Sequence, residues 1–548
     1  MKQAGLLFVV VMIWAQVAQS QTAAKSYWWI KLTDKNGTAF SITHPEEFLS
    51  QRAIERRIRQ HIAIDENDLP VSASYLDSLK KLGLEIVHTS KWLNGVTVGT
   101  GDSSLLIKVA GLPFVDTIQL SKPAMQLKSS ILKFREDELN AEIDPAGYGN
   151  AYTQIHQLNG EYLHNQGFRG KGIQIAVLDA GFWHVNEIVA FDSLRNTQRI
   201  LGIRDFVDSQ SDFYSQHSHG MSVLSCMGGN IPGSFIGTAP DASFYLFRTE
   251  DGSSEYLIEE DNWIAAAELA DSLGVDIINS SLGYSEFDDP AMNHTYAELN
   301  GHSTRVTIGA NMAVQKGILV CNSAGNEANV PWKYIIAPSD GENVIAVAAI
   351  DKDKVRAYFS SVGPASGGAV KPNVAAMGLA TALVNSSGVL GTSSGTSFSS
   401  PVLAGMTACL LQANPYANVK QLKMAIEQSA SQYLSPDSLL GFGIPDFELA
   451  DKYLKVNSTW NLNNETTVFV SPNPFNNYLM IRNPFQNSGN EVGMRIHNLQ
   501  GVCLWQSVMS TSETIILNNL NDLPDGFLIL SMHSGENEAR VKLIKKSF

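Results

Sequence analysis

Three short stretches of the chain carry side chains suited to nucleophilic catalysis. Asp179 ends the apolar run IAVLD, His219 lies in HSHGMSVL, and Ser397 lies in GTSSGTSFSSP. A serine hydroxyl is a weak nucleophile until a neighbouring base takes its proton, and a histidine oriented by a carboxylate can be that base. The three residue types together therefore predict acyl transfer, with hydrolysis of an ester or an amide as the outcome.

The local context places each candidate where such chemistry needs it. The run before Asp179 predicts a strand over 173–178, and in parallel sheets the carboxyl ends of strands host sites. His219 opens a small, apolar helix. Ser397 comes just before a predicted helix over 399–413, whose first N–H groups and dipole favour an oxyanion. Taken singly, Asp179 is more typical of a turn or a helix cap, and His219 of a polar loop.

Two rival interpretations involve the same stretches. His217 and His219 are close enough in sequence to suggest a metal site. Neither an HExxH motif nor an acid-rich ligand set accompanies them, so we expect no metal there. Ser393 fits the GxSxG nucleophile elbow of α/β-hydrolases, in which an acid and then a histidine follow the serine. Downstream of this serine the histidines are His497 and His533, both in a separate terminal segment. An esterase that uses Ser393 is therefore the weaker alternative.

The order Asp179, His219, Ser397 and the sequences around these residues resemble the subtilisin-like serine peptidases, or subtilases. Further stretches share the resemblance: GTAPDASFY, DIINSSLGY, NSAGNEA, KPNVAAMG and GFGIPD. The resemblance implies a secreted serine endopeptidase that forms an acyl-enzyme intermediate on protein or peptide substrates. In that role Ser397 is the nucleophile and His219 is first the base and then the acid. Asp179 orients the imidazole and stabilises its cation.

The resemblance also implies binding roles for residues between the histidine and the serine. Asn326 matches the asparagine whose side-chain amide donates to the oxyanion. The residues implied to pair with the substrate backbone or to wall the primary specificity pocket are Ser281, Leu282, Gly283, Ala324 and Gly325. Glu327 follows the second wall, and we hypothesise that it biases the pocket toward basic side chains.

Two residues beside the catalytic candidates depart from the family pattern. Ala180 stands where the family usually has Ser or Thr, and Met221 begins the pair that is usually Thr-His. Neither position transfers a proton, so we expect activity to be retained. A catalytically weak or silent subtilase fold used for binding is the alternative that these departures leave open.

The segment from 151 to 455 must position these residues. It alternates apolar strands with helices, which is typical of an α/β fold with a parallel sheet and helices on both faces. The predicted strands are 173–178, 243–247, 275–278, 318–321 and 344–348, and the predicted helices are 259–273, 304–316, 399–413 and 419–429. The fold class is therefore α/β, and the resemblance makes it a subtilisin-like catalytic domain.

Before this domain, residues 21–125 predict a small α+β module, and the polar stretch 126–150 predicts a linker with the processing site. The module resembles the inhibitory propeptides of subtilases, which implies a self-inhibited precursor with its own propeptide as a partner. A helix of the module carries a basic cluster made of Arg52, Arg56, Arg57 and Arg59. Glutamates lie among these arginines, so we predict a solvated helix face and not a nucleic-acid patch.

After the domain, residues 456–466 predict a linker and residues 467–548 a β-sandwich of seven short strands. This terminal module begins with VSPNPF and ends with KLIK, and it resembles the type IX secretion sorting domain. The resemblance implies that outer-membrane secretion machinery carries the chain through the periplasm and outer membrane of a Gram-negative cell. An accessory β-sandwich that binds substrate is the alternative.

The first residues of the chain predict the same route. Residues 1–20 have a basic start, a short apolar run and small residues at the end, which is typical of a secretory signal peptide. We therefore expect a secreted or cell-surface protein. The formal net charge of −15 argues against a nucleic-acid partner, since phosphate recognition needs a clustered basic surface.

The sequence predicts no cofactor for the chemistry and no disulfide framework. The four cysteines lie in apolar surroundings without CxxC spacing, which favours buried thiols. Structural calcium is common in the family that the chain resembles, and the candidate ligands are Asp205, Asp208, Asp212, Asp288 and Asp289. Solvated acidic loops are the more ordinary interpretation of these aspartates, because no EF-hand spacing is present.

Overall fold

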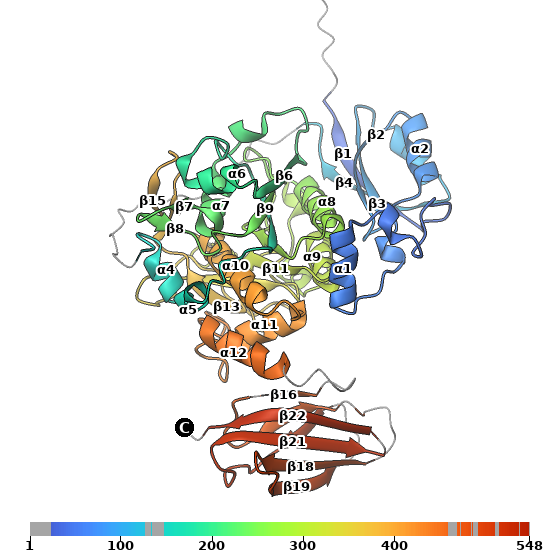
Figure 1. The fold of residues 1–548 in the computed structure, drawn as a ribbon. Helices are drawn as coiled ribbons and strands as arrows, with labels where there is room; N and C mark the ends of the chain where they lie inside the picture. The colour runs from blue at the N-terminus through green and yellow to red at the C-terminus, as the bar shows by residue number, and fades with distance from the viewer. Residues whose placement is uncertain are drawn as a thin grey trace, which may run out of the picture.

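The structure is a computed structural model of the chain. It describes residues 24–125, 133, 147–458, 468–471, 473–483, 485, 491–509, 514–535 and 537–546. The predicted signal peptide at 1–20 lies outside the described residues. So do the predicted linker at 126–150, except residues 133 and 147–150, and the linker at 456–466 beyond residue 458. Figure 1 shows the central domain, with the amino-terminal module against one side of it.

A seven-stranded parallel sheet forms the centre of the molecule, in the order β13-β12-β11-β10-β5-β9-β6. The strands are β5 (Gln174–Asp179), β6 (Ile200–Asp205), β9 (Ser243–Arg248), β10 (Ile277–Ser280), β11 (Leu319–Ser323), β12 (Ile345–Ile350) and β13 (Val374–Met377). Every residue of β10, β11 and β12 is buried, so both faces of the sheet are covered. The predicted α/β fold is confirmed.

The two edge strands were not predicted from the sequence. β6 lies at one edge, and its residues are half-buried or exposed, so it lacks the apolar run that marks a buried strand. β13 lies at the other edge and has four residues, which is too short for a periodic signal.

The helices of the central domain pack in pairs on the sheet (Figure 1). α7 (His219–Gly228) packs against α10 (Thr396–Ala413), and α8 (Ile258–Leu273) packs against α9 (Arg305–Gln315). The remaining helices are α4 (Tyr152–His156), α5 (Glu161–Asn165), α6 (Asp192–Asn196), α11 (Val419–Gln428) and α12 (Phe447–Ser458). α7 and α10 are apolar on nearly all sides, as expected of buried helices. Because they pack against each other, they bring the histidine and serine candidates together.

The amino-terminal module is a four-stranded antiparallel sheet in the order β2-β3-β1-β4, with its own apolar core. Its elements are β1 (Ser26–Leu32), α1 (Gln51–Arg59), α2 (Ala73–Lys81), β2 (Glu85–Ser90), β3 (Gly95–Thr100), α3 (Leu105–Ala110) and β4 (Val115–Lys122). The predicted α+β architecture is confirmed. The helical pattern that begins at Pro45 forms a 3₁₀ turn over Pro45–Glu47, and α1 starts anew after Ser50, whose hydroxyl accepts from Ala53 N.

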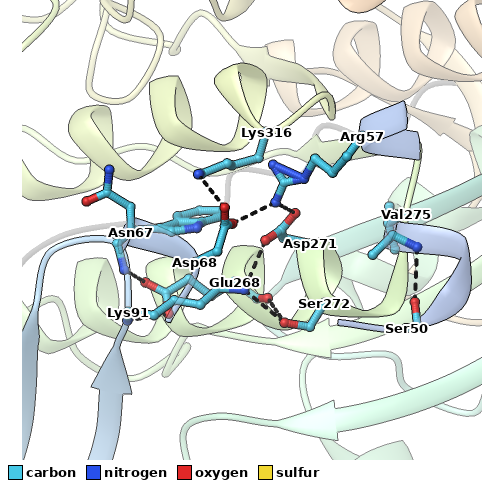
Figure 2. Close-up of polar contacts among 12 residues, drawn as sticks. Ser50, Arg57, Asn67, Asp68, Lys91, Glu268, Asp271, Ser272, Val275 and Lys316 are labelled. Carbon is cyan, nitrogen blue, oxygen red and sulfur yellow. Dashed lines mark hydrogen bonds and ion pairs between the residues drawn. The ribbon is translucent and has the colours of Figure 1, made fainter. Parts of the chain in front are cut away.

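The prediction of a solvated arginine face on α1 is wrong for Arg56 and Arg57, which are 1% exposed. Arg56 donates to the Asp271 carboxylate of α8 at 2.5 Å, and Arg57 donates to Asp271 at 2.7 Å and to Asp68 at 2.9 Å. Figure 2 shows Arg57 and Lys316 both directed at Asp68. The arginines are buried because α1 lies against α8, a contact that charge patterning along one helix does not reveal.

These residues belong to a larger cluster that we call the α8 network. Its members are Arg56, Arg57, Asp65, Asp68, Lys91, Glu268, Asp271 and Lys316. Lys91 Nζ pairs with Asp271 at 2.9 Å, and the Glu268 carboxylate accepts from the backbone N–H of Lys91 at 2.8 Å. Four cations and four carboxylates therefore join the module to α8 and to the residue after α9.

The carboxyl-terminal module has seven strands in two sheets that share one apolar core. They are β16 (Phe469–Ser471), β17 (Leu479–Arg482), β18 (Val492–Asn498), β19 (Cys503–Met509), β20 (Thr514–Leu517), β21 (Gly526–Ser534) and β22 (Asn537–Lys545). The sheets have the orders β16-β17-β20 and β19-β18-β21-β22. The predicted β-sandwich is confirmed.

Two further sequence predictions concern cysteines and membranes. All four cysteines are free thiols, and Cys226, Cys321 and Cys409 are buried as expected. The prediction of a buried thiol is wrong for Cys503, which is exposed at the start of β19. Among the described residues, the helices are too short or too polar to cross a bilayer.

Candidate active site

Asp179 and His219 meet at the carboxyl end of the sheet. Asp179 is the last residue of β5, His219 is the first residue of α7, and both side chains are buried. His219 Nδ1 lies 2.7 Å from Asp179 Oδ1. Gly220 makes this approach possible, because a Cβ there would lie 2.7 Å from Asp179 Cβ. The glycine after the histidine is therefore required by packing.

The Asp179 carboxylate is bound on one side. Oδ1 also accepts from the backbone N–H of Ala180 at 2.7 Å, whereas Oδ2 is buried without a hydrogen-bond partner in the described part of the chain. Ala180 has no hydroxyl that could donate to this oxygen. Met221 is fully buried in the core, so its side chain contributes packing.

Ser397 lies in the first turn of α10, half-buried, with its neighbour Phe398 against the histidine. The ring centroids of Phe398 and His219 are 5.8 Å apart. Ser397 Oγ donates to Ser281 O at 3.3 Å, and Ser281 Oγ donates back to Ser397 O at 2.7 Å. As the second residue of the helix, Ser397 has a backbone N–H without an intrahelical acceptor.

Asn326 is locked onto the same helix turn. Its Oδ1 accepts from both the backbone N–H and the hydroxyl of Thr396 at 2.9 Å, and the Thr396 hydroxyl also accepts from Gly325 N. These contacts orient the amide so that Nδ2 lies 3.6 Å from where a Cβ at Gly395 would be. The sequence singled out Asn326 by resemblance, but it did not reveal the role of Thr396 as its anchor.

Two backbone segments flank the serine. Ser281, Leu282 and Gly283 follow β10, and Ala324 and Gly325 follow β11, the neighbouring strand. Ile336 lies against both, because a Cβ at Gly283 would be 2.4 Å from Ile336 Cδ1 and a Cβ at Gly325 would be 3.1 Å from Ile336 Cγ1. Gly325 also has φ of +109°, which disfavours any other residue. Ile336 was missed because it lies in a short loop stretch, YIIAP, that has no helix or strand periodicity.

The rival serine has different surroundings. Ser393 is the last residue of β15 (Leu390–Ser393), and its hydroxyl is buried without a hydrogen-bond partner in the part of the chain that is described. It does not lie at a helix start. The geometry therefore favours Ser397 as the nucleophile.

The acidic candidates for calcium have local partners. Asp205 pairs with Arg248 at 2.9 Å and accepts from two backbone N–H groups, while Asp212 and Asp289 cap short 3₁₀ turns. Asp208 accepts from Gln210 N, and Asp288 accepts from Glu255 N. Within the described residues, the acidic oxygens that converge belong to three glutamates that the sequence did not single out, Glu250, Glu255 and Glu259.

Comparison with known families agrees with this geometry. A family model for the peptidase S8 or subtilase family matches residues 170–443, half of the chain, and contains all three catalytic candidates. The chain belongs to the subtilase family. A second model, for the peptidase S8 propeptide domain of Bacteroidota, matches residues 27–135 of the subtilase, and a model for a secretion system C-terminal sorting domain matches residues 469–546.

Curated relatives cover the same part of the subtilase. It is 28% identical over 334 residues to subtilisin NAT of Bacillus subtilis subsp. natto, which covers 59% of this chain and 78% of the relative. It is 29% identical over 302 residues to a subtilisin of Bacillus pumilus (54% of this chain, 97% of the relative). Serine protease AprX of Bacillus subtilis (strain 168) is 25% identical over 376 residues, covering 59% and 81%.

The matches define the class and destination of the protein. The subtilase is a serine peptidase by family, with a propeptide domain before the central domain. Its sorting domain indicates that it is secreted or displayed at the cell surface.

Proposed function

We propose that the subtilase is an endopeptidase that cleaves proteins or peptides through Asp179, His219 and Ser397, by way of an acyl-enzyme intermediate. The observation that supports this most strongly is the 2.7 Å contact between Asp179 and His219 beside the helix turn that carries Ser397 and Asn326. The reaction as proposed needs no cofactor.

The proposed reaction begins with a proton transfer. His219 Nε2 takes the Ser397 proton as Oγ attacks the scissile carbonyl, and the imidazolium then donates that proton to the leaving amine. Asp179 holds Nδ1–H and stabilises the cation that forms. Water then attacks the acyl-enzyme with His219 again as base, which releases the acid and restores the serine.

The oxyanion forms where two donors converge. We assign these to Asn326 Nδ2 and the backbone N–H of Ser397, since the Thr396 contacts hold the amide beside that turn. The backbone of Ser281, Leu282 and Gly283 would pair with the substrate on one side, and Ala324 and Gly325 would wall the primary pocket on the other.

The amino-terminal module supports the proposal of a self-inhibited precursor. The α8 network binds it to the central domain through buried ion pairs (Figure 2), so it does not leave without breaking them. After β4 the chain reaches Lys133, whose ammonium lies between three glutamates of the central domain. We propose that cleavage between residues 126 and 150 releases this inhibition.

A fluorophosphonate probe with peptide mapping tests the function on the processed protein. We expect labelling of Ser397, and loss of labelling in Ser397→Ala. We also expect peptidase kcat to fall on the order of 10⁴- to 10⁶-fold in His219→Ala. Asn326→Ala should cost about 10²- to 10³-fold in kcat, with little change in KM.

Other labelling patterns separate the alternatives. Labelling of Ser393 would establish the esterase, and ester but not peptide substrates would then be turned over. A processed protein that is not labelled at all would be a silent fold used for binding. In that case Ala180→Ser, which offers a donor to the unpartnered Asp179 Oδ2, is the first restoring variant to make.

A further inference from the structure

Three buried glutamates of the central domain, which we call the glutamate pocket, bring their carboxylates together. One oxygen each from Glu250, Glu255 and Glu259 lies within 4.8 Å of the others, and the side chains are 1%, 5% and 2% exposed. Glu250 follows β9, and Glu259 lies in the first turn of α8. Three like charges at such separations repel one another strongly away from water, so the pocket needs a cation.

Lys133 supplies that cation from the segment between the modules. Its Nζ lies 2.9 Å from Glu250 Oε2, 3.0 Å from Glu255 Oε2 and 2.6 Å from Glu259 Oε1. The backbone carbonyls of Asp251 and Ser254 accept from it as well, at 3.3 and 3.0 Å. Five oxygens thus surround an ammonium that has three protons, which is a site built for a positively charged side-chain end.

The pocket remains acidic even when Lys133 fills it. One positive charge faces three carboxylates, and two neighbouring oxygens, Glu255 Oε1 and Asp288 Oδ1, are buried without a hydrogen-bond partner in the described residues. Burial, with Glu250 and Asp288 adding to it, raises the pKa of Glu255 to about 8 although Lys133 opposes the shift. The excess of acceptors lies in the central domain itself and does not depend on which chain supplies the cation.

Two contacts link the pocket to the catalytic candidates. Tyr284 donates its hydroxyl to Glu250 at 2.6 Å, and it lies three residues after Ser281, which contacts Ser397. Thr249, the residue before Glu250, donates its backbone N–H to the Asp179 carbonyl at 2.9 Å. The three residues from Ser281 to Tyr284 span at most about 10 Å, so a short stretch of backbone connects the pocket with the residue that contacts Ser397.

We propose that the glutamate pocket is a specificity pocket for a lysine or arginine side chain of the polypeptide bound along the active site. Lys133 fills it in the precursor, and a basic residue of the substrate, several positions before the scissile bond, fills it after processing. The proposal rests on the proposed peptidase function. It favours an organic cation over calcium, which takes six to eight oxygens, because the chain itself places an ammonium there.

The test compares matched peptides on the processed enzyme. Two peptide sets carry lysine or norleucine, which has the same length without the charge, at each position before the scissile bond. We expect kcat/KM to be at least about 10-fold higher for lysine at one upstream position, since a single well-placed charge pair is worth that much when buried. Glu259→Gln should reduce this ratio several-fold. Glu286→Gln, an exposed carboxylate two residues after Tyr284, should leave it unchanged.

Fluorescence anisotropy of the same peptides, carrying a label, measures their affinities without turnover. The affinity ratio of lysine to norleucine peptides can then be compared with the ratio of kcat/KM. A lysine-to-norleucine ratio near one at every position, in both turnover and binding, would overturn the proposal while leaving the peptidase intact. So would stabilisation of the processed enzyme by calcium without any lysine preference, which would make the pocket a metal site. An enzyme that binds lysine peptides selectively but is neither labelled by fluorophosphonate nor active would support the pocket and overturn the proposed function.

Discussion

Two of the ionic contacts between the amino-terminal part of the chain and the central domain differ in charge balance. The α8 network joins four cations to four carboxylates, while the glutamate pocket joins three carboxylates to Lys133 alone. Apart from Asp65, whose side chain is 52% exposed, both are buried, so desolvation acts on both. They differ in whether the buried charges have an equal number of partners of opposite charge.

The pKa shift of Asp271 and those of the pocket glutamates follow this balance, although burial also raises the pKa of Glu268 in the α8 network. Burial alone would raise the pKa of Asp271 in the α8 network, but Lys91, Arg56 and Arg57 lower it below its usual value. In the glutamate pocket, burial raises the pKa of Glu255 and Glu259, and the neighbouring glutamates raise it further against the pull of Lys133. A balanced contact is suited to a lasting interface, and an unbalanced one to exchange of its cation.

Removing the central carboxylate of the α8 network should have the largest effect. Asp271→Ala leaves Arg56 and Lys91 buried without their main partner, which costs about 3–5 kcal/mol in other proteins. We expect a loss of this size in urea unfolding of the precursor that carries Ser397→Ala, which removes the proposed nucleophile. The control is Asp77→Asn, which changes an exposed aspartate of the amino-terminal module. Equal losses in the two variants would refute the importance of the network.

Removing the cation of the glutamate pocket should cost less, about 1–3 kcal/mol, because carboxylates with a raised pKa can take up protons. The loss in Lys133→Met should grow from pH 6 to pH 9, since the carboxyls must then ionise without a partner. Thermal unfolding at several pH values measures it, with Lys133→Arg as the control that keeps the charge. A loss independent of pH would mean that the pocket is not an excess of buried charge.

The Glu255 carboxyl should itself make stability depend on pH. Its pKa is raised in the folded protein, so its contribution is fully present below the ordinary value of 4.5 and is lost as pH rises through about 8. The groups around it are Lys133, Glu250, Glu259 and Asp288. The stability of Glu255→Gln should therefore increase relative to that of the wild type as pH rises from 5 to 8. Parallel stability curves over this range would contradict the shift.

An exposed ion pair of the amino-terminal module should have the smallest effect on stability. Lys25 and Glu85 lie 2.5 Å apart, but their side chains are 45% and 55% exposed. Glu85→Gln should change the free energy of unfolding by less than about 1 kcal/mol, and added salt should remove even that difference. A loss as large as that of Asp271→Ala would show that burial does not separate these contacts.

Local patterns in the sequence predicted much of the architecture. Apolar runs marked the five inner strands of the central sheet, and alternation marked the seven strands of the terminal sandwich. The edge strand β6 escaped because its residues are not buried, and the arginines of α1 were misassigned because helix charge patterning does not show which face meets α8. The first error is a missed element and the second a missed contact, and both arise because a local pattern does not show how an element packs against its neighbours.

By itself, the sequence determined the residue types, their order along the chain and the strand and helix ends at which Asp179, His219 and Ser397 stand. The packing of distant segments was needed to show that Asn326 is anchored by Thr396 and that Lys133 lies among three glutamates. The reason is that periodicity records which residues are buried along one element. The charge balance at a buried site depends on side chains from segments far apart in the chain. These charged groups lose their water only when the segments pack together.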